Sequence, residues 1–399
     1  MNRSAKFPQW VLMLRRLVVI PVALVFGGIL FGLHAYLAAR LVVAPAWSPG
    51  LTWFLWLGVW ALAALLFLAP VAERFLEPRQ ARFLVWPSAV WMGTGWLMLV
   101  ALAASDLIVG LLGVAGSPDL GPSAARGRAL LVLALSLPAA AIALKAGHAR
   151  PGVQRVRVGL SRWPAGLRPL RIVQITDIHI GVLLGEGFAR WLTDRVNALE
   201  PDLIAVTGDL VDGTVEHLRD RVAPFADLSA PRGVYFVTGN HDHYSGGHAW
   251  AAEVERLGFI TLRNRHVTID LDGHEVALAG VDDHRGGFLP GDGGEDLEAA
   301  FEGIDDDRPV ILLAHDPLTF KKAAKHHVDL QISGHTHGGQ IWPFHYLVRL
   351  AMPWVAGLHR VEDSLLWVSR GTGFWGPPMR LGAPAEITEL SVGSSLKLR

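Results

Sequence analysis

The first third of the chain consists of long apolar runs joined by short polar connections. A bilayer core of about 30 Å needs about 20 apolar residues in a helix, because every backbone group there has to bond within the segment. The shortest run is the fourth, which is bounded by Arg128 and Lys145 and contains Pro138. We predict a transmembrane region over residues 1–146, with helices at about residues 17–39, 51–72, 83–105 and 127–146.

Basic residues flank these runs unevenly. Eleven Lys and Arg residues lie before the first run, between the second and third runs, or after the fourth run, which all fall on one side of the membrane. Three lie on the opposite side. This asymmetry predicts that both ends of the region, and hence the rest of the chain, lie in the cytoplasm. A cleaved signal peptide is the alternative for the first run, but such apolar segments span only about 7–15 residues. Failure of the fourth run to span would move the remaining chain to the other side.

The pattern changes after a linker at residues 147–151. From residue 152 to 399, short apolar runs alternate with amphipathic stretches, which predicts an α/β domain. The amphipathic stretches are Phe188–Leu199, Glu216–Leu228, Ala249–Leu257 and Leu318–His326. The predicted strands are Leu170–Thr176, Leu203–Thr207, Val234–Thr238, Val310–Ala314 and Leu330–Ser333.

Each of these five strands is followed by side chains that can bind metal ions. Because sites in open α/β sheets lie at the carboxyl ends of the strands, these side chains are expected to converge. Structural histidines are common singly, but five successive strands that end this way favour a functional site. In chain order the candidates are Asp177 and His179, Asp209 and Asp212, Asn240 and His241, His315, and His335 with His337.

Composition narrows the chemistry of this site. The chain has no Cys, which excludes disulfides and thiolate ligands. Of 17 His, 15 lie after residue 150, where 32 acidic residues outnumber 24 basic ones. Asp, Asn and His without thiolate suit manganese, iron or zinc, and seven ligands exceed the need of one ion. Two ions about 3.5–4 Å apart could hold a bridging hydroxide and clamp the oxygens of a displacement at phosphorus. The acidic balance disfavours nucleic acid as a partner.

The motifs resemble those of the calcineurin-like metallophosphoesterases, and among them the membrane-associated bacterial group with the sequence SGHTHGGQ, here Ser333–Gln340. The closing pattern from Ser369 through Arg380 to Ile387 is similar to that group as well. The resemblance implies an αββα sandwich of two mixed sheets over residues 152–399. It implies a first metal held by Asp177, His179 and His337, a second held by Asn240, His315 and His335, and Asp209 as the bridge. It also implies that His241 faces the substrate phosphate and that Asp212 orients His241.

We therefore expect a multi-pass protein of the bacterial inner membrane whose cytoplasmic domain uses two divalent ions, manganese first, to hydrolyse a phosphodiester or pyrophosphate bond. The anchor favours a lipid-linked substrate. Arg370 and Arg380 are candidates for binding its phosphate, although surface ion pairs explain them equally well. Aromatic residues between Trp342 and Trp375 face lipid or an acyl chain, or belong to an ordinary core. The alternative is a non-enzymatic membrane sensor or transporter-associated module that binds a phosphorylated ligand, and the intact ligand set argues against it. The sequence predicts no oligomeric state.

Overall fold

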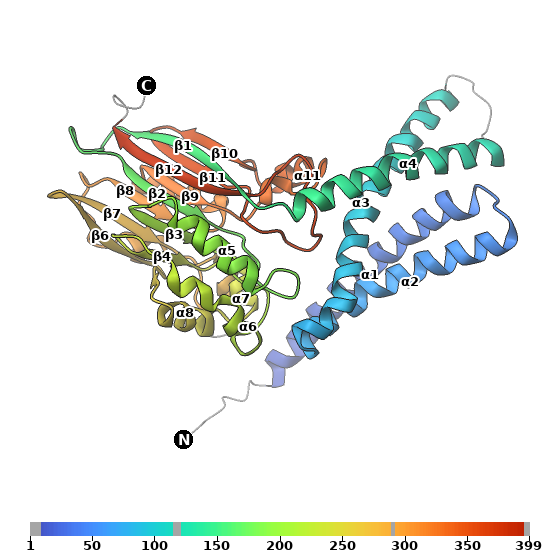
Figure 1. The fold of residues 1–399 in the computed structure, drawn as a ribbon, viewed down its shortest axis with the longest axis horizontal. Helices are drawn as coiled ribbons and strands as arrows, with labels where there is room; N and C mark the ends of the chain where they lie inside the picture. Colours follow the sequence, from blue (N-terminus) through green and yellow to red (C-terminus); the bar gives the residue numbers. More distant parts are fainter. Residues whose placement is uncertain (1–8, 115–120, 289–291, 395–399) are drawn as a thin grey trace. The chain divides into compact units, whose positions relative to one another are not determined.

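The computed structural model describes residues 9–114, 121–288 and 292–394 (Figure 1). Residues 1–8 and 115–120 of the predicted transmembrane region, and 395–399 of the predicted α/β domain, lie outside this description. The chain divides into two compact units. One holds the residues up to Ala69 together with Thr94–Ala139, and the other holds Pro70–Gly93 and the residues from Ala140 onward.

Four long helices occupy the N-terminal region, as the apolar runs predicted. Each contains a stretch long and apolar enough to cross a membrane, with mean hydropathy between 1.6 and 2.2. The helices extend beyond the predicted spans because their polar ends are still good helix formers, whereas hydropathy marks only the apolar part. α1 continues into a short π-helical turn at Ala39–Val43. The four are α1 (Gln9–Ala38), α2 (Pro49–Phe75), α3 (Pro78–Val114) and α4 (Pro122–Gly147).

A small ion cluster lies within the first unit. Asp106, the acidic residue of α3, pairs with Arg128 and with Arg40, whose Nη2 lies 3.2 Å from Asp106 Oδ2. The hydroxyl of Tyr36 donates to the same carboxylate. These partners offset the cost of a carboxylate in an apolar helix.

The α/β domain contains two six-stranded mixed sheets, so the predicted αββα architecture is confirmed (Figure 1). The first sheet has the order β1 (Gly152–Leu160), β12 (Glu386–Ser394), β2 (Leu170–Ile175), β3 (Leu203–Thr207), β4 (Val234–Val237) and β5 (Ile260–Thr261). The second has the order β10 (Gly357–Val361), β11 (Ser364–Val368), β9 (Leu330–Ser333), β8 (Val310–Leu313), β7 (His274–Gly280) and β6 (Arg265–Leu271).

The central strands β3, β4 and β8 are apolar at nearly every position because both faces of the sheets are covered there, whereas the outer strands β1, β6 and β10 carry exposed polar residues. In β3, Leu203 and Ala205 point into the core between the sheets, while Ile204 and Val206 face the outer helices. The outer face of the first sheet packs against α5 (Glu186–Asn197), α6 (Val215–Val222) and α8 (Gly247–Arg256). The second packs against α9 (Leu297–Phe301) and α10 (Phe320–Ala323). Two further helices, α7 (Asn240–Tyr244) and α11 (Phe344–Ala351), lie in the loops that follow β4 and β9.

The strand directions bring the predicted ligands to one edge. β2, β3 and β4 run parallel to one another in the first sheet, and β8, β9 and β11 do so in the second. The buried amide of Gln174 joins the two sheets near these carboxyl ends. Its Nε2 donates to the Ser333 carbonyl at 3.0 Å, and its Oε1 accepts from Trp367 Nε1 at 3.1 Å. The loops after five strands therefore open toward the same region.

Candidate metal centre

Two groups of potential metal ligands face each other at this edge. The first consists of Asp177, His179 and His337, and the second of Asp209, His315 and His335. Within each group the ligand atoms lie within 4.8 Å of one another. All six were predicted from the strand-end motifs, and they come from both sheets. The predicted seventh ligand, Asn240, is the first residue of α7 and is buried.

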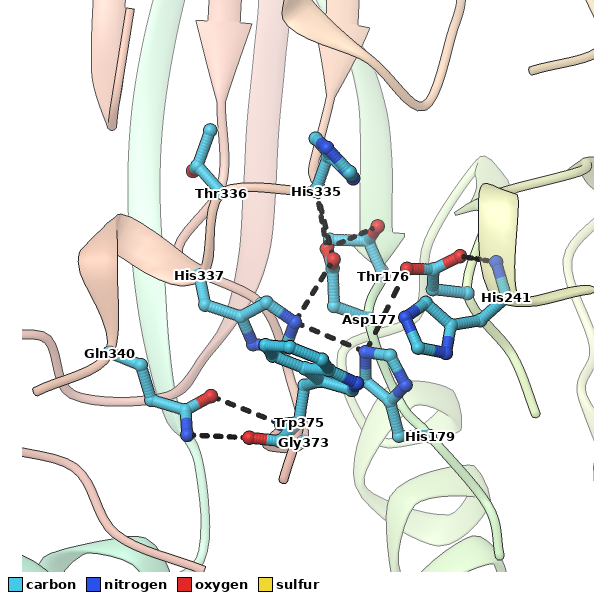
Figure 2. Close-up of polar contacts among 12 residues, drawn as sticks. Thr176, Asp177, His179, His241, His335, Thr336, His337, Gln340, Gly373 and Trp375 are labelled. Carbon is cyan, nitrogen blue, oxygen red and sulfur yellow. Dashed lines mark hydrogen bonds and ion pairs between the residues drawn. The ribbon is translucent and has the colours of Figure 1, made fainter. Parts of the chain in front are cut away.

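The first group is compact. His337 Nε2 lies 3.4 Å from Asp177 Oδ1 and 3.1 Å from His179 Nε2, as Figure 2 shows. The backbone N–H of His335 donates to both oxygens of Asp177, and the hydroxyl of Thr176 donates to Oδ2 at 2.8 Å. Asp177 is thus oriented by the loop that carries the ligands of the neighbouring sheet.

Asp209 links the two groups, as a bridging ligand has to. Its Oδ2 lies 3.8 Å from His179 Nε2 of the first group and 3.2 Å from His315 Nε2 of the second. The backbone N–H of His241 donates to its Oδ1 at 2.8 Å. In the second group, His315 Nε2 lies 3.0 Å from His335 Nδ1. A carboxylate in this position can serve two cations.

Partners of the other ring nitrogens leave the facing nitrogens free to bind metal. His315 Nδ1 lies 2.9 Å from the Thr207 carbonyl, which can only accept, so this nitrogen carries the proton and Nε2 does not in the neutral ring. His179 Nδ1 lies 3.1 Å from both oxygens of Asp212, which orients its Nε2 in the same way. In their neutral form both histidines therefore present a lone pair to Asp209 and its surroundings.

Several ligands adopt a backbone conformation that L-residues rarely take. Positive φ angles occur at Asp177 (52°), His179 (53°), Asp209 (51°), His335 (72°) and His337 (50°). Such conformations cost of order 1–3 kcal/mol each and persist where the surrounding structure enforces them. The glycines at these turns allow the close packing: a Cβ at Gly334 would lie 2.2 Å from Asp177 Oδ2, and one at Gly239 would lie 2.2 Å from Asp209 Oδ1.

His241 and Asp212 form a pair beside the two groups. His241 Nδ1 lies 2.7 Å from Asp212 Oδ1, and the His241 ring is packed edge-on against His179. Burial would raise the pKa of the Asp212 carboxyl, but the imidazoles of His179 and His241 hold it well below its usual range. His241 keeps a partly exposed side chain, with its ring 5.8 Å from that of Trp375. A partly exposed imidazole with one nitrogen fixed and one free is suited to proton transfer.

The carboxylate of Asp242, two residues after Asn240, supports the site from behind. Asp242 accepts from the backbone N–H groups of Leu210 and Gly239 at 2.9 and 2.8 Å. These N–H groups lie in the loops that carry Asp209 and Asn240. Burial raises the pKa of Asp242 to about 6. A role for Asp242 was not predicted from the sequence.

Arg285, which was not predicted from the sequence, also belongs to the site. Its Nη1 lies 3.5 Å from Asn240 Oδ1 and 3.2 Å from His335 Nε2, so a guanidinium borders the second ligand group. Two buried carboxylates hold the guanidinium there: its Nη1 lies 3.5 Å from Asp316 Oδ2 and 3.9 Å from Asp283 Oδ2. Neither Oδ2 atom has a hydrogen-bond partner. Asp283 follows β7 just as the ligands follow their strands, and this pattern points to the segment as a rim of the site or a strand-ending turn, but not to Arg285 itself.

The two arginines proposed to bind phosphate are engaged with the protein. Arg370 pairs through Nε with Glu386 Oε2 at 2.7 Å and is partly exposed. Arg380 is 1% exposed, and its Nη1 donates to the carbonyls of His337, Arg370 and Ala383. It thus lies behind the first ligand group. A direct contact with substrate stays a prediction for both residues.

The donor set fits divalent ions. Each group combines carboxylate oxygen with neutral imidazole nitrogen, and the oxygen of Asn240 adds a ligand without charge. Such sets suit manganese, iron and zinc. Asp209 Oδ2 and the imidazoles around it are buried, so without cations the cost of their desolvation would be poorly offset. The residues present are therefore those that two divalent ions would require.

Comparison with known proteins agrees with this geometry. The model of the calcineurin-like phosphoesterase family matches residues 170–339, a range that contains all seven predicted ligands, His241 and Asp212. A transmembrane protein with metallophosphoesterase domain from Bos taurus is 42% identical over 251 residues, which are 60% of this chain and 56% of that protein.

Bacterial relatives are similar over larger shares of their own length. An uncharacterised metallophosphoesterase of Campylobacter jejuni is 36% identical over 66% of this chain and 68% of its own length. One from Aquifex aeolicus is 31% identical over 60% of this chain and 91% of its own. This chain spans a little over half of the length of the Bos taurus relative.

Proposed function

Because the chain belongs to the calcineurin-like phosphoesterase family, we propose that it is a membrane-anchored enzyme that hydrolyses a phosphodiester or pyrophosphate bond. The observation that carries the proposal is the contact between His241 and Asp212 beside two intact ligand groups. A domain that only bound a phosphorylated ligand would have no need for an oriented imidazole at this place.

Asp177, His179 and His337 would hold one divalent ion, and Asn240, His315 and His335 the other, with Asp209 between them. Bound there, the ions would neutralise the charge of the phosphoryl oxygens and lower the pKa of water. Manganese is the ion that we propose, with iron or zinc as the alternatives to be tested.

The protein residues have three further tasks. Asp212 fixes the His241 ring by accepting from Nδ1, which leaves Nε2 to protonate the leaving oxygen. Arg285 presents cationic N–H donors at the border of the second group, where they can bind a phosphoryl oxygen. Asp283 and Asp316 keep this guanidinium in place.

We further propose that the substrate is linked to a lipid. Four helices able to cross a membrane support this, because an enzyme fixed to the bilayer gains access to substrates that do not leave it. The distribution of Lys and Arg supports an inner-membrane protein whose α/β domain lies in the cytoplasm. A protease-sensitive tag after residue 399, assayed in intact and in permeabilised cells, tests this orientation.

The activity test uses the full chain in detergent with Mn²⁺. Hydrolysis of bis(p-nitrophenyl) phosphate is expected, with at least a hundredfold lower rate for the Asp209→Asn variant, on the scale of about 10²–10³ for loss of a key electrostatic group. Equal rates for the two proteins would contradict the proposal. A lipid extract incubated with each protein then identifies the phospholipid that disappears only with the unmodified one. Binding of a phosphorylated lipid without turnover would favour the sensor alternative.

A further inference from the structure

α11 presents an apolar face to solvent. Tyr346, Leu347 and Leu350 are 57%, 49% and 84% exposed, and Trp342 just before the helix is 51% exposed. The three helix residues lie on one side, since positions three and four apart are neighbours on a helix. No residue of α11 is buried. Large apolar side chains seldom gather on a surface without a partner, and we call these four residues the α11 surface.

The α11 surface is joined to the metal centre through few residues. His337 precedes Trp342 by five positions in the chain, and Gln340 lies between them. The Gln340 side chain holds Trp375 at both backbone groups: Nε2 donates to the Trp375 carbonyl at 2.8 Å, and Oε1 accepts from its N–H at 3.0 Å (Figure 2). Trp375 is half exposed, and its ring lies 5.8 Å from that of His241. An apolar molecule on the α11 surface would thus lie near the imidazole.

The segment that carries Trp375 is also tied to the end of α4. The backbone N–H of Arg380 donates to the Ala143 carbonyl at 2.8 Å. A Cβ at Gly147 would lie 2.3 Å from the Pro378 carbonyl oxygen, so the end of α4 and the segment that carries Trp375 are in contact there. Only four residues separate α4 from β1, a distance of at most about 14 Å when extended. α4 is apolar enough to cross a bilayer, which limits how far the Trp375 segment can lie from the lipid.

Resting on the proposed function, we infer that the α11 surface docks on the bilayer that holds the helices and admits the acyl part of a lipid-linked phosphoester to the site. Tyr and Trp have apolar rings with a polar edge and favour the headgroup level, while Leu347 and Leu350 enter the acyl boundary. Arg349 is exposed on the same helix and can bind lipid phosphates. The continuity of this surface with α4 and with His241 selects a bilayer as its partner over a second copy of the chain.

A single spectroscopic probe tests the docking. The chain has no Cys, so Leu350→Cys carries one label, and His274→Cys is the matched control at the turn between β6 and β7, at the end of β7 away from the site. Both full-length proteins are placed in nanodiscs of phosphatidylethanolamine and phosphatidylglycerol that contain doxyl-labelled acyl chains. We expect strong quenching at position 350 and little at 274. Equal quenching at both, or pyrene excimers at 350 without quenching by lipid, would overturn the inference.

Activity separates docking from catalysis. The Leu347→Glu and Leu350→Glu double variant is expected to hydrolyse the phospholipid substrate at least tenfold more slowly in nanodiscs, while its rate on soluble bis(p-nitrophenyl) phosphate stays within twofold. His274→Glu should change neither rate. Equal loss on both substrates would contradict a role in lipid access. If the unmodified protein hydrolyses neither substrate, the proposed function fails, and the quenching experiment still decides whether the surface docks.

Discussion

Asp212 Oδ1 lies 2.7 Å from His241 Nδ1, and the same carboxylate lies 3.1 Å from His179 Nδ1. One residue thereby orients both the proposed proton donor and a proposed metal ligand. This arrangement is possible because Asp209 and Asp212 lie three residues apart in the loop that follows β3. Changes at His241 and at Asp212 should consequently have different effects.

His241→Ala should lower kcat by about 10²–10⁴-fold, the usual contribution of a general acid, while both metals stay bound. Asp212→Asn should lower kcat and also weaken the metal at His179, whose ring it orients. Metal content by mass spectrometry and turnover of the soluble diester check both. Loss of both metals from His241→Ala would show that this residue is a ligand.

Asp209→Asn should cost more metal than any other single change. The carboxylate lies between the two groups, so an amide in its place would weaken metal binding at both. The imidazoles of His179 and His315 would then face a neutral side chain. We expect less than half of the metal of the unmodified protein after dialysis, and at least a hundredfold lower turnover, on the scale of about 10²–10³. Asp270→Asn, on the exposed part of β6, is the control and should retain both metals. Full metal content in the Asp209 variant would argue against the bridging position.

Metal affinity should rise with pH. Burial lowers the pKa of His179, but the carboxylates of Asp212, Asp209 and Asp177 outweigh it and raise the pKa to about 9 in the metal-free protein. Below pH 9 a proton occupies this imidazole and has to leave when metal binds, so acid opposes binding. The dissociation constant for Mn²⁺ should increase about tenfold or more for each unit of pH below 9. Titrations at pH 6.5, 7.5 and 8.5 measure it, and a constant affinity would contradict the protonated state of His179.

Arg285→Ala should raise KM at least tenfold and weaken inhibition by inorganic phosphate to a similar degree, with a smaller change in kcat. Removing the guanidinium also leaves Asp283 and Asp316 buried without their cation, which destabilises the domain. Arg285→Lys keeps that charge and should recover folding and part of the phosphate affinity. Arg308→Lys, in an ion pair with Glu275, is the matched control. Unchanged phosphate inhibition in both Arg285 variants would refute the contact.

The sequence predicted the metal ligands because each follows its own strand directly. A local pattern of apolar residues and then Asp, Asn or His is enough to assign Asp177, Asp209 or His335 to the edge of a sheet. Arg285 lacks such a pattern, and its contact with Asp316 joins loops that are 31 residues apart in the chain. Nothing in the local sequence distinguishes Arg285 from the other arginines of the domain.

The same limit applies to the sheets. β1 pairs in parallel with β12 over nine residues, from Gly152 opposite Glu386 to Leu160 opposite Ser394. Alternation along each strand predicts which residues are buried but carries no information on which partner lies beside it. In the helices, hydropathy located the apolar cores but not the ends, because Pro78–Ala81 is helical without being apolar.

The five left-handed ligands have a consequence for the history of this chain. The surrounding contacts enforce these conformations, and glycine would adopt each of them without the strain of a Cβ. A descendant that lost its catalytic role would relieve this backbone strain by replacing His179 or His337 with glycine, whereas glycine at Asp177 would also leave the His335 N–H without its acceptor. The decay of such an enzyme would start in the backbone of the site, and a glycine at one of these turns would identify a pseudoenzyme before any missing helix or strand did.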